Sequence, residues 1–223
     1  MKQRHLLPLL WLLLGALTFS ASLQAQNEFS RKSVFTLNVG PSWYSGQFMG
    51  ITNDAGSYSD DLRKGMAWSL GYWYQGKAPT EEGLKIGPGF IYQGSSYRQT
   101  HETGADKIGM HYLAPQFGVF YLRTHYQLQL STGIGYQFYN DKSTVYGKSR
   151  KVSMDKIAYN LALGGEYYLS RQWGVSARLN WLASNTERYS VRYNGKTWNI
   201  EHPENGEGYF GQLSLLFGLN YHF

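Results

Sequence analysis

Residues 213–223 read LSLLFGLNYHF, and this stretch decides the fold. Apolar or aromatic side chains stand at every second position, namely Leu213, Leu215, Phe217, Leu219, Tyr221 and Phe223. Successive side chains of a β-strand point to opposite faces, so the alternation predicts a strand with one apolar face. Chain termini usually fray in water. A two-faced strand that keeps its apolar face to the last residue therefore predicts a setting other than water.

The same alternation recurs along the chain. It predicts strands over residues 33–44, 66–75, 84–97, 109–121, 128–139, 157–169, 174–183 and 209–223. The gaps between them are alternately long and short, which is typical of an up-and-down barrel in an outer membrane, with long loops outside and short turns and both termini inside. The sequence thus predicts an all-β fold, an eight-stranded antiparallel up-and-down transmembrane β-barrel that closes between its first and last strands.

Aromatic residues support this prediction. The chain has 19 Tyr, 7 Trp and 26 Gly. This enrichment is expected where aromatic belts meet a bilayer and glycines let strands bend. If the strands alternate in direction, one aromatic belt falls at the short-turn end and a second at the long-loop end. No amphipathic helix is available to cover the apolar face, so its solvent must be lipid.

Residues 1–25 have the order of a cleaved signal peptide. Lys2 and Arg4 precede an apolar run over residues 6–17, which is too short to span a membrane as a helix. We therefore expect two parts, the signal peptide 1–25 and an outer-membrane β-barrel domain 26–223. The chain has no Cys, which excludes disulfides and thiolate metal sites. Its formal net charge is +6, but export argues against nucleic acid as a partner of the basic residues.

The strand count, the alternating gaps, the belts and the FGLNYHF ending resemble the eight-stranded bacterial outer-membrane barrels, typified by OmpX and the transmembrane domain of OmpA. The resemblance implies a porin-like integral protein of the Gram-negative outer membrane with periplasmic termini. Its last residues resemble the C-terminal signal that the outer-membrane assembly machinery recognises. The residues of that signal would be Phe217, Leu219, Tyr221 and Phe223.

Two sets of residues are candidate sites. Glu166 and Arg178 both face the lumen, and a three-residue turn between their strands would place them opposite each other as an ion pair. A basic segment either contacts lipopolysaccharide phosphates or forms an ordinary solvated loop. Its candidate residues are Lys142, Lys148, Arg150, Lys151 and Lys156. No residues form a recognisable catalytic, cofactor or metal site, and His101 and His202 are expected to be solvated loop residues.

Asn194-Gly195 lies between two alternating segments and predicts a two-residue hairpin turn. Strands seven and eight would then extend outward as a ribbon, with one register shift near Pro203, Gly206 or Gly208. The preferred function is a non-enzymatic barrel whose lumen is blocked by side chains and whose loops and ribbon serve surface binding, including a surface protein ligand, or envelope integrity. A lipid A-modifying outer-membrane enzyme and a barrel subunit of a secretion or envelope-assembly machine are the alternatives.

Overall fold

The computed structural model describes residues 32–48, 51–53, 55–75, 82–102, 104–186, 188–201 and 208–223. The expected signal peptide, residues 1–25, lies outside the described residues, as does His202. In the part of the chain that is described, no α-helix is long and apolar enough to cross a membrane.

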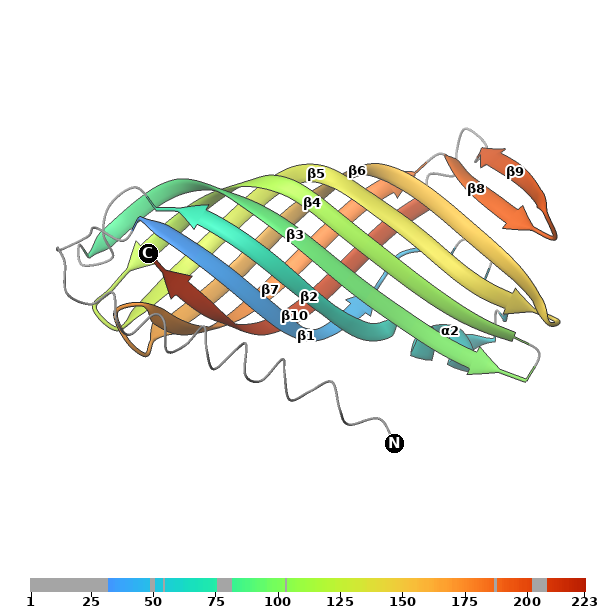
Figure 1. The fold of residues 1–223 in the computed structure, drawn as a ribbon, viewed down its shortest axis with the longest axis horizontal. Coiled ribbons are helices and arrows are strands. Elements are labelled where there is room, and N and C mark those ends of the chain that lie inside the picture. The colour runs from blue at the N-terminus through green and yellow to red at the C-terminus, as the bar shows by residue number, and fades with distance from the viewer. Residues whose placement is uncertain are drawn as a thin grey trace, which may run out of the picture. The chain divides into compact units, whose positions relative to one another are not determined.

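Ten strands and one short helix make up the fold of the described residues (Figure 1). Their bounds are β1 Ser33–Tyr44, α2 Gly56–Leu62, β2 Lys64–Tyr74, β3 Gly83–His101, β4 Gly104–Leu122, β5 Tyr126–Val145, β6 Lys148–Tyr168, β7 Trp173–Thr186, β8 Arg188–Tyr193, β9 Lys196–Glu201 and β10 Gly208–His222. All the strand pairs are antiparallel.

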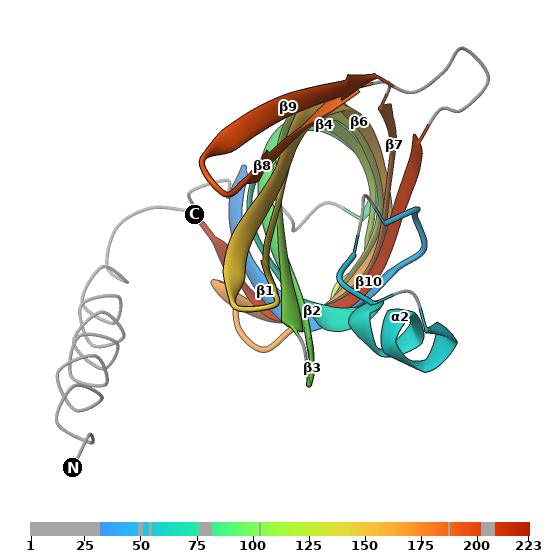
Figure 2. The ribbon, with the colours of Figure 1, turned by 90° about the vertical axis from the view of Figure 1, so that its right-hand side faces the viewer.

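Eight of the strands, β1 to β7 and β10, close into a ring (Figure 2). The ring closes where β1 pairs with β10, from Val34 opposite His222 to Tyr44 opposite Gln212. At the end of this seam the backbone N–H of Ser33 donates to the carbonyl of Phe223 at 3.1 Å, and the reverse bond measures 2.9 Å. The predicted eight-stranded barrel and its closure are confirmed.

Exposure alternates along the membrane-spanning strands of the ring as the sequence pattern predicts. In β1, Leu37 is 51% exposed on the outside of the ring, whereas its neighbour Asn38 is 2% exposed inside it. In β10, Phe217 and Leu219 are about half exposed on the outside, as is Phe223 at the end of the chain. An apolar outer wall around an interior that buries many polar side chains is the reverse of a water-soluble barrel and fits a hydrocarbon surrounding.

Two groups of exposed aromatic residues mark the two ends of the apolar wall. The group at the end that holds the C-terminus includes Phe35, Tyr72, Tyr74, Tyr126, Tyr167 and Phe223, and the group toward the opposite end includes Trp43, Trp68, Tyr136, Phe138, Tyr159, Trp181 and Tyr209. We call them the inner and outer aromatic belts. The stretch from Phe35 to Trp43 on β1 and the stretch from Tyr159 to Tyr167 on β6 are each nine residues long, which suits a hydrocarbon layer crossed by tilted strands.

Two of the predicted long loops are strands instead. β3 and β4 continue until His101 lies opposite Gly104, and β5 and β6 continue to a turn at residues 146–147. Tyr146 and Gly147 have positive φ values of 46° and 76°, which this tight turn requires. The prediction was wrong here because the apolar face of these strands changes sides beyond the outer belt: the inward face is mainly apolar, and most charged residues point outward.

The predicted Asn194-Gly195 turn is confirmed, with φ values of 49° and 77° and Tyr193 opposite Lys196. The ribbon it forms does not simply extend strands seven and eight. β8 pairs instead with the outer part of β6, where Val191 lies opposite Val152. The predicted register shift near Pro203, Gly206 or Gly208 falls between the pair of Thr186 with Gly208 and the pair of Arg188 with Glu201, where residues 187 and 202–207 lie outside the described residues.

Candidate functional site

The inner half of the lumen holds polar side chains beside a buried apolar cluster of Val34, Trp73, Phe120 and Leu122. Glu166 is buried and accepts hydrogen bonds from His222 Nε2 at 2.6 Å and from Gln127 Nε2 at 2.6 Å. Gln127 accepts in turn from Gln75 at 3.0 Å and from the Tyr168 hydroxyl at 3.2 Å. These bonds join β5, β6 and β10 with the residue after β2 across the inner mouth of the barrel.

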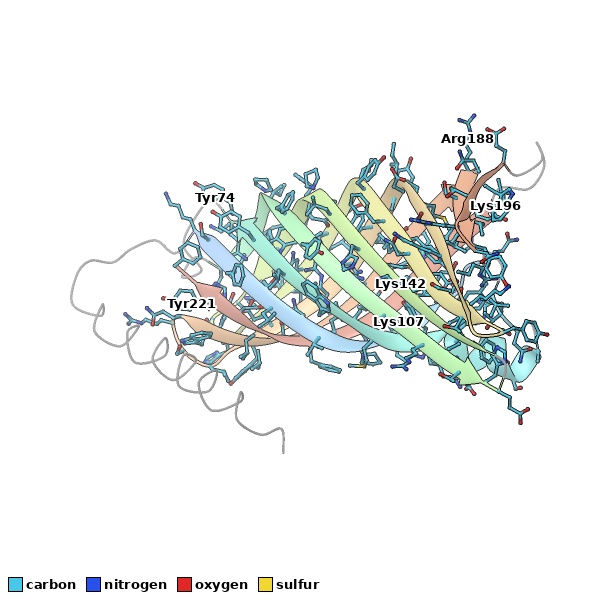
Figure 3. All side chains as sticks on the ribbon, turned by 45° about the vertical axis from the view of Figure 1, so that its right-hand side comes forward. Tyr74, Lys107, Lys142, Arg188, Lys196 and Tyr221 are labelled. Carbon is cyan, nitrogen blue, oxygen red and sulfur yellow. The ribbon has the colours of Figure 1, made fainter. Side chains whose placement is uncertain are left out.

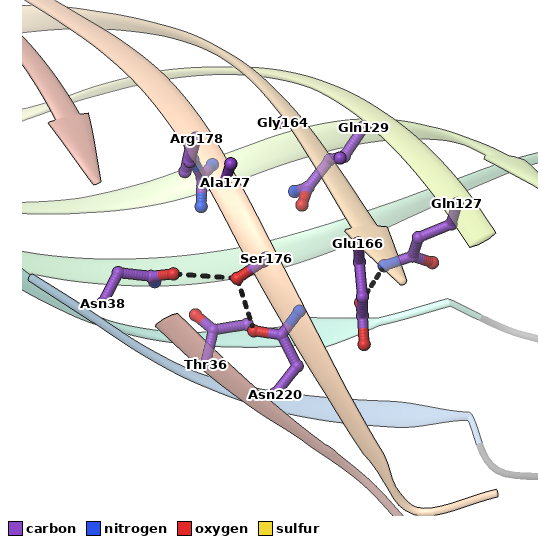
Figure 4. Close-up of a pocket in the computed structure, with 11 residues that line it drawn as sticks. Thr36, Asn38, Gln127, Gln129, Gly164, Glu166, Ser176, Ala177, Arg178 and Asn220 are labelled. Atoms are coloured by element: carbon purple, nitrogen blue, oxygen red, sulfur yellow. Dashed lines mark hydrogen bonds between the residues drawn. The ribbon is translucent and has the colours of Figure 1, made fainter. Parts of the chain in front are cut away.

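The predicted ion pair between Glu166 and Arg178 is wrong. Glu166 lies opposite Ser176, and Arg178 lies opposite Gly164. Among the described residues, the guanidinium of Arg178 donates to Ser131 Oγ at 2.6 Å and packs over the Trp73 ring at 5.4 Å, while Glu166 bonds to other partners (Figure 4).

The reason is the turn between β6 and β7. The amides of Leu169 and Ser170 both donate to the carbonyl of Trp173, at 2.9 and 3.0 Å, and Tyr168 lies opposite Gly174. The three-residue turn expected from the sequence would instead place Ser170 opposite Gly174. This difference shifts the register by two residues, so the charged residues keep the predicted lumenal face but not the predicted contact.

The middle of the lumen is filled by amides and apolar side chains. Asn180 donates to Gln93 at 2.6 Å and accepts from Asn160. A cavity of about 20 Å³ lies among polar residues that include Thr36, Gln129 and Asn220 (Figure 4). Such a volume holds about one water molecule.

The outer half of the lumen holds an apolar cluster instead. Its buried members are Tyr44, Tyr58, Leu62, Tyr97, Ile108, Met110, Tyr139, Val152, Met154 and Phe210. Phe48, Ile51, Tyr189 and Val191 pack against it. The inward apolar face of the extended β3 to β6 strands thus builds a core beyond the outer belt.

A segment between β1 and β2 closes over this core. We call it the outer strap, the described residues 51–53 and 55–62, which include α2. Buried Asp106 on β4 holds it: the carboxylate accepts hydrogen bonds from the Thr52 amide at 2.9 Å, the Thr52 hydroxyl at 2.5 Å and the Tyr58 hydroxyl at 2.8 Å. Burial raises the pKa of the Tyr58 hydroxyl to about 12.

A second carboxylate lies beside Asp106, outside the expected membrane region. Arg150 Nη2 is 3.5 Å from Asp106 Oδ1 and 3.6 Å from Asp141 Oδ2, and both carboxylates are fully buried. Burial, followed by repulsion from Asp106, raises the pKa of Asp141 to about 7. Sequence reasoning missed this cluster because it treated the segments carrying these three residues as loops.

The outside of the same strands carries a row of five exposed basic residues, which we call the basic row: Arg98, Lys107, Lys142, Lys151 and Arg192. Arg98 lies opposite Lys107, Lys142 opposite Lys151, and Lys151 opposite Arg192. The ladder on both sides of Lys107 and Lys142 keeps one register, which places these two opposite each other as well. Figure 3 shows them on the outer faces of β4 and β5.

This geometry divides the predicted phosphate contacts. Lys142, Lys148 and Lys151 are exposed, and two of them belong to the basic row. Arg150 points inward to the two carboxylates, and Lys156 is 6% exposed with its Nζ 2.8 Å from the centroid of the Phe210 ring. The prediction is therefore wrong for Arg150 and Lys156, because even-numbered residues of β6 face the interior from Arg150 onward.

The described residues include no group of three or more His, Cys, Asp or Glu side chains arranged to hold a metal ion. His111 faces outward at the outer belt, where its Nδ1 bonds the Tyr92 hydroxyl at 2.9 Å. His101 bonds the Thr52 hydroxyl through Nε2 at 2.9 Å, so it supports the strap and is not the solvated loop residue that was expected.

No model of a known protein family matches the chain, and no curated protein matches it. Solved structures do match. A major outer membrane protein from Thermus thermophilus is 11% identical with a TM-score of 0.55, over 86% of this chain and 99% of that one. This chain has the fold of the outer-membrane β-barrels.

Two further structures agree. The outer membrane protease OmpT from Escherichia coli is 10% identical with a TM-score of 0.52, over 90% of this chain and 99% of that one. The outer membrane protein OprG from Pseudomonas aeruginosa is 12% identical with a TM-score of 0.51, over 87% of this chain and 97% of that one. The predicted resemblance is confirmed for the fold, and at these identities the likeness extends no further.

Proposed function

We propose that this protein is a non-enzymatic component of the bacterial outer membrane that binds lipopolysaccharide phosphates through its basic row and so contributes to envelope integrity. The observation that carries the proposal is the row itself, five exposed cations on five neighbouring strands beyond the outer belt. Two observations support the proposal: the row lies just beyond an aromatic belt, where a barrel would meet lipid headgroups, and side chains fill the lumen.

The orientation belongs to the proposal. The end with extended strands, the strap and the β8–β9 hairpin would face the outside, and the end that holds Ser33 and Phe223 would face the periplasm. Both termini would then be periplasmic, and the outward-facing C-terminal residues Phe217, Leu219, Tyr221 and Phe223 would meet the assembly machinery before insertion.

The energetics of the basic row favour an anionic partner. Neighbouring strands are about 4.8 Å apart, and like charges directly opposite on a sheet destabilise it. Phosphates that bridge the row would remove this repulsion and add charge-assisted hydrogen bonds. Each Lys or Arg beside an anionic membrane surface contributes about 1 kcal/mol of binding free energy.

A titration of labelled lipopolysaccharide into the detergent-solubilised protein tests the proposal. We expect Lys107→Gln, Lys142→Gln and Lys151→Gln together to weaken binding by about 100-fold, from about 1 kcal/mol for each charge. Dephosphorylated lipopolysaccharide should bind the unchanged protein as weakly.

A matched variant controls for net charge. Lys32, Arg123 and Arg171 are exposed at the opposite end, and their replacement with Gln removes three charges as well. This control variant should bind lipopolysaccharide with an affinity within about twofold of that of the unchanged protein. Equal loss in both triple variants, or equal binding of dephosphorylated lipopolysaccharide, would contradict the proposal. Shortened or added acyl chains after incubation would instead support the enzyme alternative.

The β8–β9 hairpin supports a second candidate, binding of a surface protein. β9 is the terminal strand of the sheet, so one of its edges has no neighbouring strand among the described residues, and Trp198 and Ile200 are 46% and 37% exposed on it. Such edges accept an added strand from a partner. A photo-reactive residue at Thr197 should cross-link a protein in intact cells, and a Thr197→Pro variant that still folds should bind less of it.

A further inference from the structure

The outer strap is held in an unusual way. Its Thr52 and Tyr58 bond to a carboxylate that is fully buried at the outer end of the lumen. Beneath the strap lies the apolar cluster, with Tyr58 and Leu62 as members. We propose that the strap is a pH-sensitive latch over the outer mouth of the barrel, tightened when the carboxylate pair of Asp106 and Asp141 takes up a proton.

The two buried carboxylates share a single guanidinium. Arg150 is the one guanidinium between the two carboxylates among the described residues, at 3.5 and 3.6 Å, so the ionised trio carries a net negative charge. Asp141 accepts a bond from Ser143 at 3.2 Å through Oδ2, but its buried Oδ1 has no hydrogen-bond partner in the described part of the chain. An uncompensated buried charge is costly, and protonation of one carboxylate removes it.

Titratable and charged groups from several elements surround the carboxylates of Asp106 and Asp141. Tyr139 and Asp141 come from β5, Asp106 from β4 and Arg150 from β6. Tyr58 from α2 donates to Asp106 directly, and His101 from β3 bonds the Thr52 hydroxyl. Tyr193 from β8 lies opposite Arg150. Arg150 alone among these groups is a permanent cation, so one of the two carboxylate charges has no cationic partner among them.

Closure of the strap is linked to proton binding by Asp141. With the strap closed, the pKa of Asp141 is raised from 3.8 to about 7. Opening admits water to the carboxylates and returns Asp141 toward its ordinary pKa, so opening releases a proton. A raised pKa in the closed state means that closure is favoured as pH falls below 7 and weakened as pH rises toward 7, with little further change above about 8.

Hydrogen exchange of the peptide covering residues 51–62, measured by mass spectrometry on the full chain in detergent, tests the latch. After correction for intrinsic exchange rates, the opening constant should rise by up to about 50-fold between about pH 5 and pH 7 and then level off. In Asp141→Asn, which keeps the size and removes the charge, the constant should stay low and flat over this range.

Two control variants separate the effect of the Asp141 charge from the effect of the strap contact. Asp155→Asn changes an exposed carboxylate that bonds Tyr136 on the outer wall, and it should leave the pH profile unchanged. Thr52→Val removes a strap bond to Asp106, and it should raise exchange at every pH without changing the pH dependence. A flat profile in the unchanged protein, or an unaltered rise in Asp141→Asn, would overturn the latch. Unchanged exchange in Thr52→Val would show that Asp106 does not hold the strap.

Discussion

Replacement of His222 by Leu should destabilise the barrel through one buried contact. His222 and Glu166 are about 1% and 2% exposed in their side chains, and their Nε2 and Oε1 atoms lie 2.6 Å apart. The Leu variant leaves Glu166 buried with Gln127 as its remaining bonded partner among the described residues. Loss of one member of a buried pair costs about 3–5 kcal/mol, and the bond from Gln127 places the expected loss near the lower end, about 3 kcal/mol.

Urea unfolding in lipid vesicles, followed by Trp fluorescence, measures this loss. If the destabilisation comes from the stranded carboxylate, the same His222→Leu change should cost less than about 1 kcal/mol when Glu166 is already Leu. The double-mutant cycle should therefore give a coupling energy of at least about 2 kcal/mol between these residues.

Arg178 supplies the contrasting cycle, since it bonds Ser131 and not Glu166. Arg178→Met and Glu166→Leu should be additive within about 0.5 kcal/mol, as expected for side chains that share no bond. Strong coupling of Glu166 to Arg178 together with additivity toward His222 would refute the described network and restore the pair expected from sequence.

Other predictions concern single buried positions and the filled lumen. Lys156→Met should leave stability equal or raise it, because Nζ over the Phe210 ring has no hydrogen-bond partner among the described residues, and lipopolysaccharide affinity should not change; urea unfolding and titration check both. Gly87→Ala should destabilise the barrel by about 1–3 kcal/mol, since a Cβ there would collide with the Tyr74 carbonyl, whereas Gly164→Ala has ordinary contacts and should cost less in the same unfolding measurement. The purified protein should show no steady ion conductance in planar bilayers, and regular conductance steps would contradict a filled lumen.

The membrane-spanning part of the fold could be predicted from sequence because the bilayer imposes a simple rule. An outward residue such as Leu37 meets lipid and an inward residue such as Asn38 meets the lumen, so each spanning strand repeats with a period of two. The closure of the ring has the same origin, since neither edge strand can remain unpaired in hydrocarbon.

Beyond the outer belt the same alternation carries the opposite polarity. Tyr139 and Val152 point into a buried cluster, while Lys142 and Lys151 point into the aqueous layer. A search for apolar outward faces therefore treats these strands as loops. Three of the residues expected to contact phosphate do face outward, but Arg150 and Lys156 could be assigned inward only once the strands were known to continue.

The lumenal network depended on register, which local pattern does not determine. The prediction that Glu166 and Arg178 face the lumen was correct. The turn after Tyr168 differs from the expected one, so the observed register does not place the two residues opposite each other. The true partner, His222, belongs to β10, and contacts across the lumen between nonadjacent strands leave no short-range signal in the sequence.

Site-specific photo-cross-linking in living cells tests the central claim most directly. A photo-reactive residue at Lys142, in the basic row, should form an adduct with lipopolysaccharide, while the same residue at Arg171, in the turn between β6 and β7, should form none. An adduct at Arg171 and none at Lys142 would show that the barrel is inserted the other way round. Absence of an adduct at both positions would contradict the binding of lipopolysaccharide by the basic row.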